Sequence, residues 1–286
     1  MGLRTKEEMF KDLKPKIQSK AESLLNWFRE REKVVVALSG GVDSSVIAAF
    51  AYLALNDNAV AVTGVSPTLA KSELEDAKII ASRIGIQHII LDYDKLANHQ
   101  VGKNEENRCY YCRNELGRLM RSIAYKMEVK TLVDGGIFED ISMRRPGVKA
   151  FRENGVVSPL QEIGITKDNV RKLARSVGLP NFDKPSNACL ASRFPYGQTI
   201  TRQALTRVDE AEMMIKKITG ARQIRVRIHI DIARIEVAPL ERKMFFKDSV
   251  MDLINEKMRK IGFQYVTLDL AGYRTGSLDE ALKYDI

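Results

Sequence analysis

The sequence is poor in the residues that build disulfide frameworks and large metal sites. Its 286 residues include only three cysteines, three histidines and one tryptophan. An odd number of cysteines argues against a disulfide framework and favours metal or thiol chemistry. Long apolar runs are also missing, since none approaches the roughly 18 to 20 residues that a membrane helix needs. The polar N-terminus has no apolar signal core, so we expect a cytoplasmic protein without a membrane partner.

Positive charge is what the sequence has in excess. Lys and Arg number 46 against 37 Asp and Glu, which gives a net charge of +9. This balance suits an anionic partner such as a nucleotide, a phosphorylated small molecule or RNA. Charge alone does not choose among these partners, because a solvated lysine-rich surface accounts for much of the excess.

The most informative motif is SGGVDSS at residues 39–45, directly after the apolar run 34–38. A β-branched run that closes on Ser-Gly-Gly predicts a buried strand turning into a helix over 46–55. The two glycines let the backbone approach a ligand, and the helix N-terminus directs free N–H groups towards it. The serines add hydroxyl donors, and Asp43 can hold a magnesium ion. The motif predicts a phosphate cradle, although it lacks the lysine of the Walker-type loop.

Strands and helices alternate through the first two thirds of the chain, which predicts an α/β fold with a parallel, doubly wound sheet. Ser72 and Glu75 predict a capping box at the start of one helix. In such sheets ligands bind at the carboxyl ends of the strands, where the motif at 39–45, Ser66 and Gly135 would converge. The predicted strands are 34–38, 59–65, 86–91 and 131–136, the last ending in glycines, and the predicted helices include 7–28, 46–55 and 113–127.

The pattern changes around residues 179–197, where prolines interrupt the periodicity. We therefore predict two domains, a nucleotide-binding domain at 1–185 and a smaller α+β substrate domain at 186–286. The elements predicted for the second domain are helices at 201–219 and 240–261 and strands at 223–229, 232–237 and 263–270.

The cysteines form a Cys-Tyr-Tyr-Cys motif, Cys109 and Cys112, with Cys189 much later in the chain. Several interpretations stay open: a redox dithiol, a zinc site, inert core thiols, or an iron–sulfur cluster held by three thiolates with one iron open. Zinc would need a fourth ligand, and no histidine lies at a ligand-like spacing from a cysteine: His88, His99 and His229.

Arg225 and Arg227 alternate with apolar residues in the predicted strand 223–229, so both lie on the face opposite the core. Guanidinium groups bind phosphate and carboxylate through two hydrogen bonds, and the pair therefore predicts an anion site. Solvation is the alternative for any single surface arginine. Four loop arginines are further candidates: Arg144, Arg145, Arg193 and Arg274.

Glu212 interrupts an apolar stripe along the predicted helix 201–219. A carboxylate in a buried stripe is costly unless it is paired or functional. A structural salt bridge, a catalytic acid or base, and a group that positions an arginine all remain open for it.

The motif at 39–45 resembles the PP-loop of the ATP pyrophosphatase superfamily, and nearly the whole chain resembles the LarE-type ATP-dependent sulfur transferases. The most specific segments are CLASRFPYG at 189–197 and RVRIHIDIARIE at 225–236. Weaker matches lie at 134–135, 143–147, 158–160 and 267–276. The three cysteines are similar to the family branch that holds a [4Fe-4S] cluster.

This resemblance implies a smaller reaction partner than RNA. ATP would adenylate a carboxylate of a pyridinium dicarboxylate mononucleotide, and sulfur would then replace AMP to leave a thiocarboxylate of nickel-pincer nucleotide biosynthesis. The implied cofactors are ATP, Mg²⁺ and the cluster, and the implied partners are the substrate, a sulfide source and further copies of the chain. In another branch the cysteine matching Cys189 gives up its own sulfur, and this sacrificial mechanism is an alternative.

The resemblance also implies roles for individual residues. Arg113 matches a basic position that faces the nucleotide phosphates, and the three cysteines match the cluster ligands. The phosphate and magnesium residues would be Ser39, Gly40, Gly41, Asp43 and Ser44, and the substrate or pyrophosphate residues would be Arg193, Glu212, Arg225, Arg227 and Arg274.

Two other functions compete with this prediction. A tRNA thiolation enzyme shares the loop and the cysteine arrangement, but such enzymes usually carry zinc-binding cysteines or an RNA-binding module that this sequence lacks. A non-catalytic nucleotide-binding module would need the loop at 39–45 and no cysteine trio.

Overall fold

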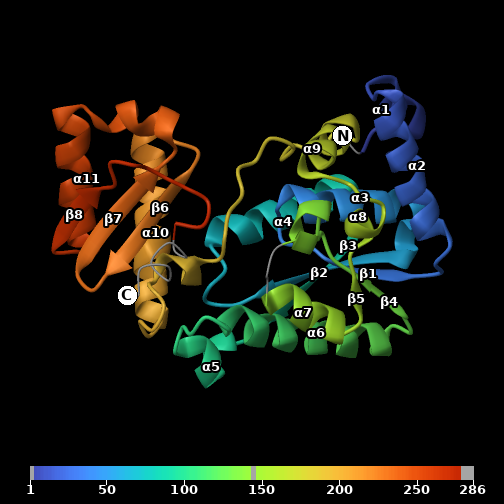
Figure 1. The fold of residues 1–286 in the computed structure, drawn as a ribbon, viewed down its shortest axis with the longest axis horizontal. Coiled ribbons are helices and arrows are strands. Elements are labelled where there is room, and N and C mark those ends of the chain that lie inside the picture. The colour runs from blue at the N-terminus through green and yellow to red at the C-terminus, as the bar shows by residue number, and fades with distance from the viewer. Residues whose placement is uncertain (1–2, 143–145, 278–286) are drawn as a thin grey trace. The chain divides into compact units, whose positions relative to one another are not determined.

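The computed structural model describes residues 3–142 and 146–277. These residues divide into two compact units, each with its own sheet (Figure 1). The first unit contains the described residues up to Lys95 and from Asn107 to Ser186. The second unit contains Leu96–Glu106 and the described residues from Asn187 onward.

A five-stranded parallel sheet forms the centre of the first unit, in the order β3-β2-β1-β4-β5. From β1 the chain adds β2 and β3 on one side of the sheet and then β4 and β5 on the other. The strand order therefore reverses between β1 and β4. This topology confirms the predicted doubly wound α/β fold. The strands are β1 (Val34–Ala37), β2 (Ala59–Val65), β3 (Gln87–Asp92), β4 (Thr131–Val133) and β5 (Val156–Val157).

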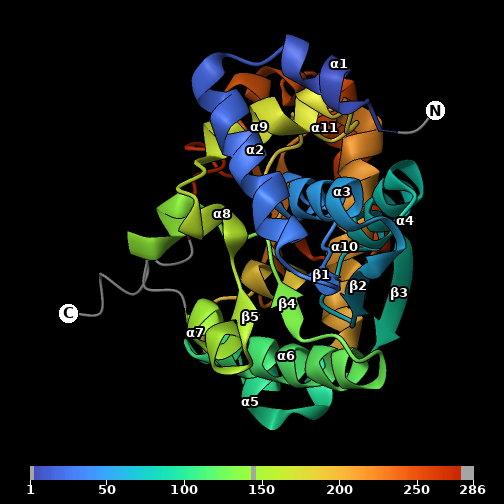
Figure 2. The same cartoon turned by 90° about the vertical axis from the view of Figure 1, so that its right-hand side faces the viewer.

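Helices cover both faces of this sheet (Figures 1 and 2). Val34 and Val36 of β1 pack into one apolar core, and Val35 between them packs into the other. This alternation follows from the two-residue period of a strand. The first core is covered by α2 (Pro15–Arg29), α3 (Val42–Leu55), α4 (Lys71–Ile84) and α9 (Lys167–Ser176), and the second by α6 (Arg108–Lys126) and α7 (Pro146–Glu153).

Two predictions about helix starts are wrong in the first unit. The single helix predicted at 7–28 is α1 (Lys6–Lys11) followed by α2, because Pro15 takes the first position of α2, where its missing N–H is not needed. The capping box of Ser72 is also absent. Helix α4 begins at Lys71 after Ala70, since a turn closed by Leu69 N–H and the Ser66 carbonyl (2.9 Å) already directs the chain into it.

Two other helices begin earlier than the sequence predicts. Helix α3 begins at Val42 rather than at residue 46, and α6 begins at Arg108 rather than at residue 113. In both cases the apolar periodicity that marks a helix starts only after the first turn. As a result Asp43, Cys109 and Cys112 lie on helices and not in loops.

The second unit contains a three-stranded sheet in the order β6-β7-β8 (Figure 1). β6 (Ile224–His229) and β7 (Ile232–Val237) are antiparallel, and β8 (Tyr265–Leu268) runs parallel to β7. Helix α10 (Arg202–Thr219) matches its prediction. The helix predicted at 240–261 is instead a 3₁₀ segment, η5 (Pro239–Phe245), followed by α11 (Asp248–Lys260).

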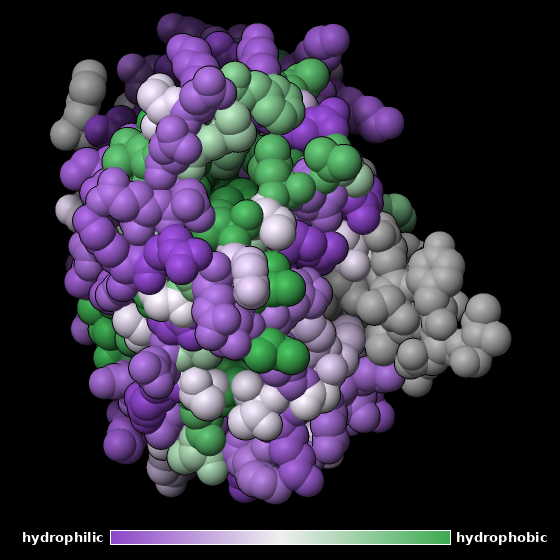
Figure 3. Space-filling view, turned by 90° about the vertical axis from the view of Figure 1, so that its left-hand side faces the viewer, coloured by the Kyte–Doolittle hydropathy of each residue, from purple (hydrophilic) through white to green (hydrophobic). Residues whose placement is uncertain are grey.

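Some apolar side chains of the second unit face solvent. Leu240 is 89% exposed and Leu270 is 80% exposed, and both line a surface hollow with Phe246 and Leu268. Figure 3 shows apolar side chains among hydrophilic ones on a face of this unit. In the described ranges, no helix combines the length and the apolar character needed to cross a membrane.

We predict that Gly135→Ala destabilises the first unit. A Cβ at this position would lie 2.6 Å from the backbone nitrogen of Ser44 and 2.8 Å from the carbonyl carbon of Asp43, so backbone must shift. The expected loss is about 1 to 3 kcal/mol in the free energy of unfolding, measured by urea denaturation. Gly102→Ala is the control, because its Cβ would make only an ordinary contact. Equal stability of both variants would contradict the close approach.

Candidate active site

Hydroxyl groups hold the loop between β1 and α3. The Ser39 N–H donates to Ser44 Oγ at 3.1 Å, and the Oγ atoms of Ser39 and Ser44 lie 3.0 Å apart. Ser44 Oγ and Ser45 Oγ donate to the Gly41 carbonyl at 3.1 and 2.8 Å. The serines of the motif therefore fix the loop's shape in addition to any contact with phosphate.

The first turn of α3 has no side-chain cap. Gly41 is the N-cap residue and offers no side chain to the N–H groups that follow it. Gly40 adopts φ +75°, and a Cβ there would lie 2.7 Å from the Glu73 carbonyl, so only glycine fits. An uncapped helix N-terminus reached by a glycine loop is an anion-binding arrangement. The geometry agrees with the predicted phosphate cradle.

Two residues that the sequence analysis did not identify, Asn181 and Lys184, form hydrogen bonds with this loop. Asn181 Nδ2 donates to the Gly40 carbonyl (3.1 Å) and to Ser45 Oγ (2.9 Å). Lys184 Nζ donates to the same carbonyl at 3.3 Å and pairs with Glu73 at 2.9 Å. Because both residues lie far from the motif in the sequence, no local pattern could have indicated them.

Asp43 forms an ion pair that the sequence analysis also missed. Its two carboxylate oxygens accept from Lys167 Nζ at 2.7 and 2.6 Å. Burial raises the pKa of the Asp43 carboxyl, and the charge of Lys167 opposes that rise. Lys167 is the first residue of α9, so the pair joins the starts of two helices. The predicted magnesium ligand is thus held by an ammonium group in this structure.

The carboxyl ends of β1 and β4 do meet, as predicted. Gly135 lies against the backbone of Ser44, and Asp134 accepts a hydrogen bond from Ser158 Oγ at 2.6 Å. Arg113 of α6 approaches Asp134 with 3.6 Å between Nη1 and Oδ2. Ser66 is buried after β2, where its Oγ lies 3.5 Å from Thr68 Oγ1.

Cys109 and Cys112 lie at the start of α6. A spacing of three residues puts both thiols on one face of the helix. Neither forms a disulfide; Cys109 is exposed and Cys112 is half-buried, and Cys112 Sγ accepts a hydrogen bond from Lys95 Nζ at 3.3 Å. Across residues 3–142 and 146–277, no three His, Cys, Asp or Glu side chains form a preassembled metal site. The pair on α6 therefore supplies two ligands at most.

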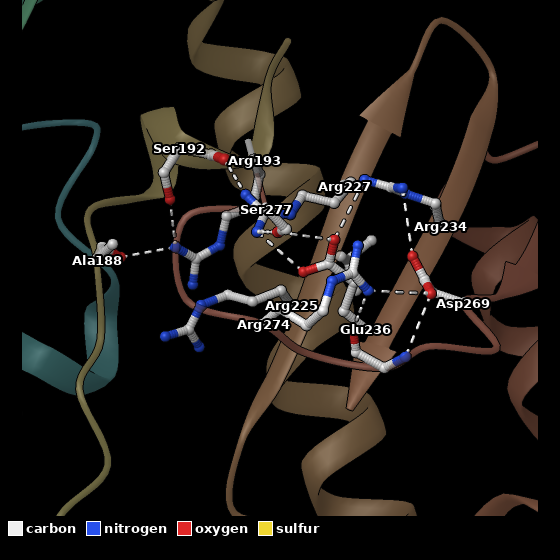
Figure 4. Close-up of polar contacts among 12 residues, drawn as sticks. Ala188, Ser192, Arg193, Arg225, Arg227, Arg234, Glu236, Asp269, Arg274 and Ser277 are labelled. Carbon is white, nitrogen blue, oxygen red and sulfur yellow. Dashed lines mark hydrogen bonds and ion pairs between the residues drawn. The ribbon is translucent and has the colours of Figure 1, made fainter. Parts of the chain in front are cut away.

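Cys189 is exposed in the second unit, directly before the 3₁₀ helix η4 (Leu190–Arg193). The guanidinium of Arg193 is fully buried beneath this segment (Figure 4). Its Nη1 donates to the Ala188 carbonyl at 2.7 Å and to the Cys189 carbonyl at 3.2 Å, and its Nη2 donates to Asn187 Oδ1 at 3.1 Å. Arg193 therefore fixes the backbone that presents the Cys189 thiol.

Glu212 of α10 holds Arg193 through two parallel hydrogen bonds. Nε donates to Oε1 at 2.8 Å and Nη2 donates to Oε2 at 2.9 Å, while the Val226 N–H also donates to Oε1. Burial by itself would raise the pKa of Glu212, but the charge and hydrogen bonds of Arg193 outweigh it and hold the pKa below its usual value. An ionised, fully bonded carboxylate suits the arginine-positioning interpretation.

Arg225 and Arg227 are covered by protein. They are 3% and 5% exposed, so the face of β6 that they share is not an open surface. The charge alternation in the sequence could not show this, because the cover comes from η4 and from the segment near Ser277. Arg227 donates to Glu236 Oε2 and to Ser277 Oγ, both at 2.9 Å, and to the Ser192 carbonyl (Figure 4).

The surroundings of Arg225 disfavour its charged form. Burial and the neighbouring charge of Arg193 lower the pKa of Arg225 to about 10. Its guanidinium carbon lies 5.2 Å from the centre of the Tyr273 ring. Several guanidinium groups close together in a buried place favour an anion, which would relieve their repulsion.

Arg274 is partly exposed, with 3.9 Å between its Nη1 and Asp269 Oδ1, and it donates to the Gly272 carbonyl at 3.2 Å. Figure 4 places it among the polar residues of the second unit. The other two loop arginines predicted from the sequence, Arg144 and Arg145, lie outside the described residues.

Comparison with known proteins identifies a matching family and several proteins of similar sequence. Residues 18–135 match the NAD synthase family. The pyridinium-3,5-bisthiocarboxylic acid mononucleotide synthase of Lactiplantibacillus plantarum is 35% identical over 93% of this chain and 96% of that protein. An uncharacterised protein of Synechocystis sp. is 42% identical over 93% of this chain and 99% of that protein. The tRNA-specific 2-thiouridylase MnmA of Rickettsia massiliae is 27% identical over 57% of this chain and 55% of that protein.

A parallel sheet with a PP-loop at its switch point defines an ATP-using enzyme of the PP-loop class. Within that class the chain belongs to the LarE-type family of ATP-dependent sulfurtransferases, because the similarity to the Lactiplantibacillus plantarum synthase extends over nearly the full length of both proteins.

We predict that Glu212→Gln destabilises the protein in a pH-dependent way. Breaking one partner of a buried ion pair costs about 3 to 5 kcal/mol, because the charge of Arg193 remains buried. The pKa of Glu212 in the folded protein lies below its usual value, so its contribution to stability is complete above that usual value and is lost as the pH falls through the folded pKa. Urea unfolding at neutral pH and in acid should show the difference from wild type shrinking in acid.

Glu210→Gln is the matched control for this prediction, because Glu210 lies on the same helix with an exposed side chain. It should change the free energy of unfolding by less than about 0.5 kcal/mol at either pH. A pH-independent loss in Glu212→Gln would show that its carboxylate is not held ionised by Arg193.

Proposed function

We propose that this protein uses ATP to convert a carboxylate of a pyridinium dicarboxylate mononucleotide into a thiocarboxylate. The observation that carries the proposal is the 35% identity with the bisthiocarboxylic acid mononucleotide synthase over nearly the full length of both chains. ATP transfers AMP to the carboxylate oxygen and pyrophosphate leaves. A sulfur nucleophile then attacks the activated carbonyl carbon, and AMP leaves.

The first step needs phosphate binding, which the first unit can supply. A carboxylate is a poor electrophile until its oxygen belongs to a good leaving group. The uncapped N–H groups of α3 and the charge of Arg113 would stabilise the phosphates. We assign this role to Ser39, Gly40, Gly41, Ser44, Ser66, Arg113 and Gly135.

Magnesium would bind next to Asp43. Carboxylate oxygens and phosphate oxygens together suit Mg²⁺, which keeps several of its waters. Lys167 now occupies both oxygens of Asp43, so nucleotide binding would have to redirect its ammonium. A triphosphate offers such an alternative partner, since an ammonium group pairs with a phosphate as a point charge.

The buried arginines of the second unit would hold the anionic substrate. Arg225, whose pKa is lowered by burial and by the charge of Arg193, would gain from a bound carboxylate or phosphate. Arg227 and Arg274 would add to this site. Glu212 and Arg193 have a different role in the proposal, because their hydrogen bonds are directed at each other and at the segment that carries Cys189.

We further propose that Cys109, Cys112 and Cys189 bind a [4Fe-4S] cluster. The sequence has three cysteines and no fourth, none of them in a disulfide, and two of the thiols lie on one helix face, which supports this proposal. When bound, such a cluster would offer an open iron position for a sulfide. Arg193 would orient the third ligand by fixing the backbone of Cys189. Sacrifice of the Cys189 sulfur is the competing mechanism.

Two partner predictions accompany this proposal. A sulfide source must supply the sulfur, because a chain that keeps its cysteines has to be reloaded after each transfer. Assembly into a homo-oligomer also stays a prediction from the resemblance. The similarity to the tRNA thiolation enzyme covers little more than half of either chain, so it favours the small nucleotide as substrate over tRNA.

We predict that Asp43→Ala lowers AMP formation from ATP by roughly 100-fold or more, because a ligand and organising charge of the phosphate site is lost. The measurement is release of AMP and pyrophosphate with the mononucleotide present. Asp57→Ala is the control, since Asp57 is exposed after α3. Adenylation at the wild-type rate in Asp43→Ala would show that the loop has been misinterpreted.

We predict that anaerobic reconstitution with iron and sulfide gives a broad visible absorption band and roughly four irons per chain. Cys112→Ala should lose the band and sulfur transfer while it still forms AMP, because the phosphate loop is untouched. Full sulfur transfer by Cys112→Ala would favour sacrifice of Cys189 instead. Binding of zinc in place of iron would rule out the cluster.

A further inference from the structure

Lys95 is a buried ammonium group whose partner is a sulfur atom. Its side chain is 7% exposed, and Nζ donates to Cys112 Sγ at 3.3 Å. Within the described part of the chain, no carboxylate forms an ion pair with it. A buried ammonium without an anion is costly. The fold therefore places a positive charge beside this particular sulfur.

A second donor reaches the same sulfur. Burial, followed by the charge of Cys112 and a hydrogen bond with it, raises the pKa of Tyr93 well above its usual value. The hydroxyl of Tyr93 therefore stays protonated and can donate to Cys112. Room for Tyr93 comes from Gly64 of β2, where a Cβ would lie 2.9 Å from its ring. Lys95 and Tyr93 thus approach Cys112 from the segment that follows β3.

The nearby acid does not neutralise Lys95. Glu115 lies on α6, three residues after Cys112, and its Oε2 is buried without a hydrogen-bond partner. Burial raises the pKa of Glu115, the charge of Asp94 adds to the rise, and the charge of Lys95 opposes it. The charge of Lys95 thus affects the pKa of Glu115, although the two side chains form no ion pair in the described structure. The charge of Lys95 remains available to whatever is held at Cys112.

We propose that Lys95 is the positioning residue for sulfur chemistry at Cys112, where its ammonium orients the side chain and balances negative charge on the sulfur species held there. The class of ligand is an anionic sulfur group, either the cysteine sulfur itself or a hydrosulfide delivered next to it. This inference rests on the proposed sulfur transfer.

The experiment compares an anionic and a neutral thiol reagent on the metal-free protein. Iodoacetate and iodoacetamide are attacked by the same sulfur, so the ratio of their rates at Cys112 cancels thiol reactivity and reports local positive charge. Mass spectrometry of the Cys112 peptide gives both rates. Lys95→Met should lower the iodoacetate-to-iodoacetamide ratio several-fold, and Lys95→Arg should retain it. Lys126→Met is the control, because Lys126 is an exposed residue of α6, the helix that carries Cys112.

Thermal unfolding of the same metal-free variants separates this role from a structural one. Because a buried, poorly paired charge is removed, Lys95→Met should keep or raise Tm. An unchanged reagent ratio in Lys95→Met overturns the proposal. If Lys95→Met also has a lower Tm that Lys95→Arg restores, the role of Lys95 is structural. If the wild type binds no iron, the cluster proposal fails, whereas the reagent ratio still decides the role of Lys95.

Discussion

The nucleotide end of this protein depends on how closely backbone can approach the first turn of α3. Gly135 after β4 and Gly40 before the helix both lie where a Cβ would collide with backbone atoms. The helix N-terminus, uncapped because its N-cap residue is Gly41, therefore lies close to backbone at the switch point of the sheet. Asp43 projects from that turn and meets Lys167 of α9, so the site already contains a charge pair that an incoming phosphate can reorganise.

Charge burial organises the second unit in a comparable way. Glu212 and Arg193 form a fully buried pair, and the remaining donors of Arg193 bind the backbone around Cys189. Such pairs contribute little net stability compared with apolar packing, but they define geometry. The Cys189 side chain is exposed, while Arg193, which fixes its backbone, is buried.

The sequence predicted the sheet well and the site only in part. Strands such as β1 and β2 have β-branched runs that carry their own signal, whereas the starts of α3 and α6 were placed too late because their apolar periodicity begins only after the first turn. Lys167, Asn181 and Lys95 were missed, since each acts on a partner that only the fold brings near. The burial of Arg227 was likewise invisible, because distant segments supply its cover.

The attachment of Asn181 and Lys184 to the Gly40 carbonyl has a consequence for how chain length can vary in this family. Two side chains of the segment that leaves the first unit, three residues apart, donate hydrogen bonds to this carbonyl. An inserted or deleted residue between them would pull on the carbonyl at Gly40 and disturb the turn before α3. We therefore expect an insertion after Lys184 to disturb the turn before α3 less than one between Asn181 and Lys184.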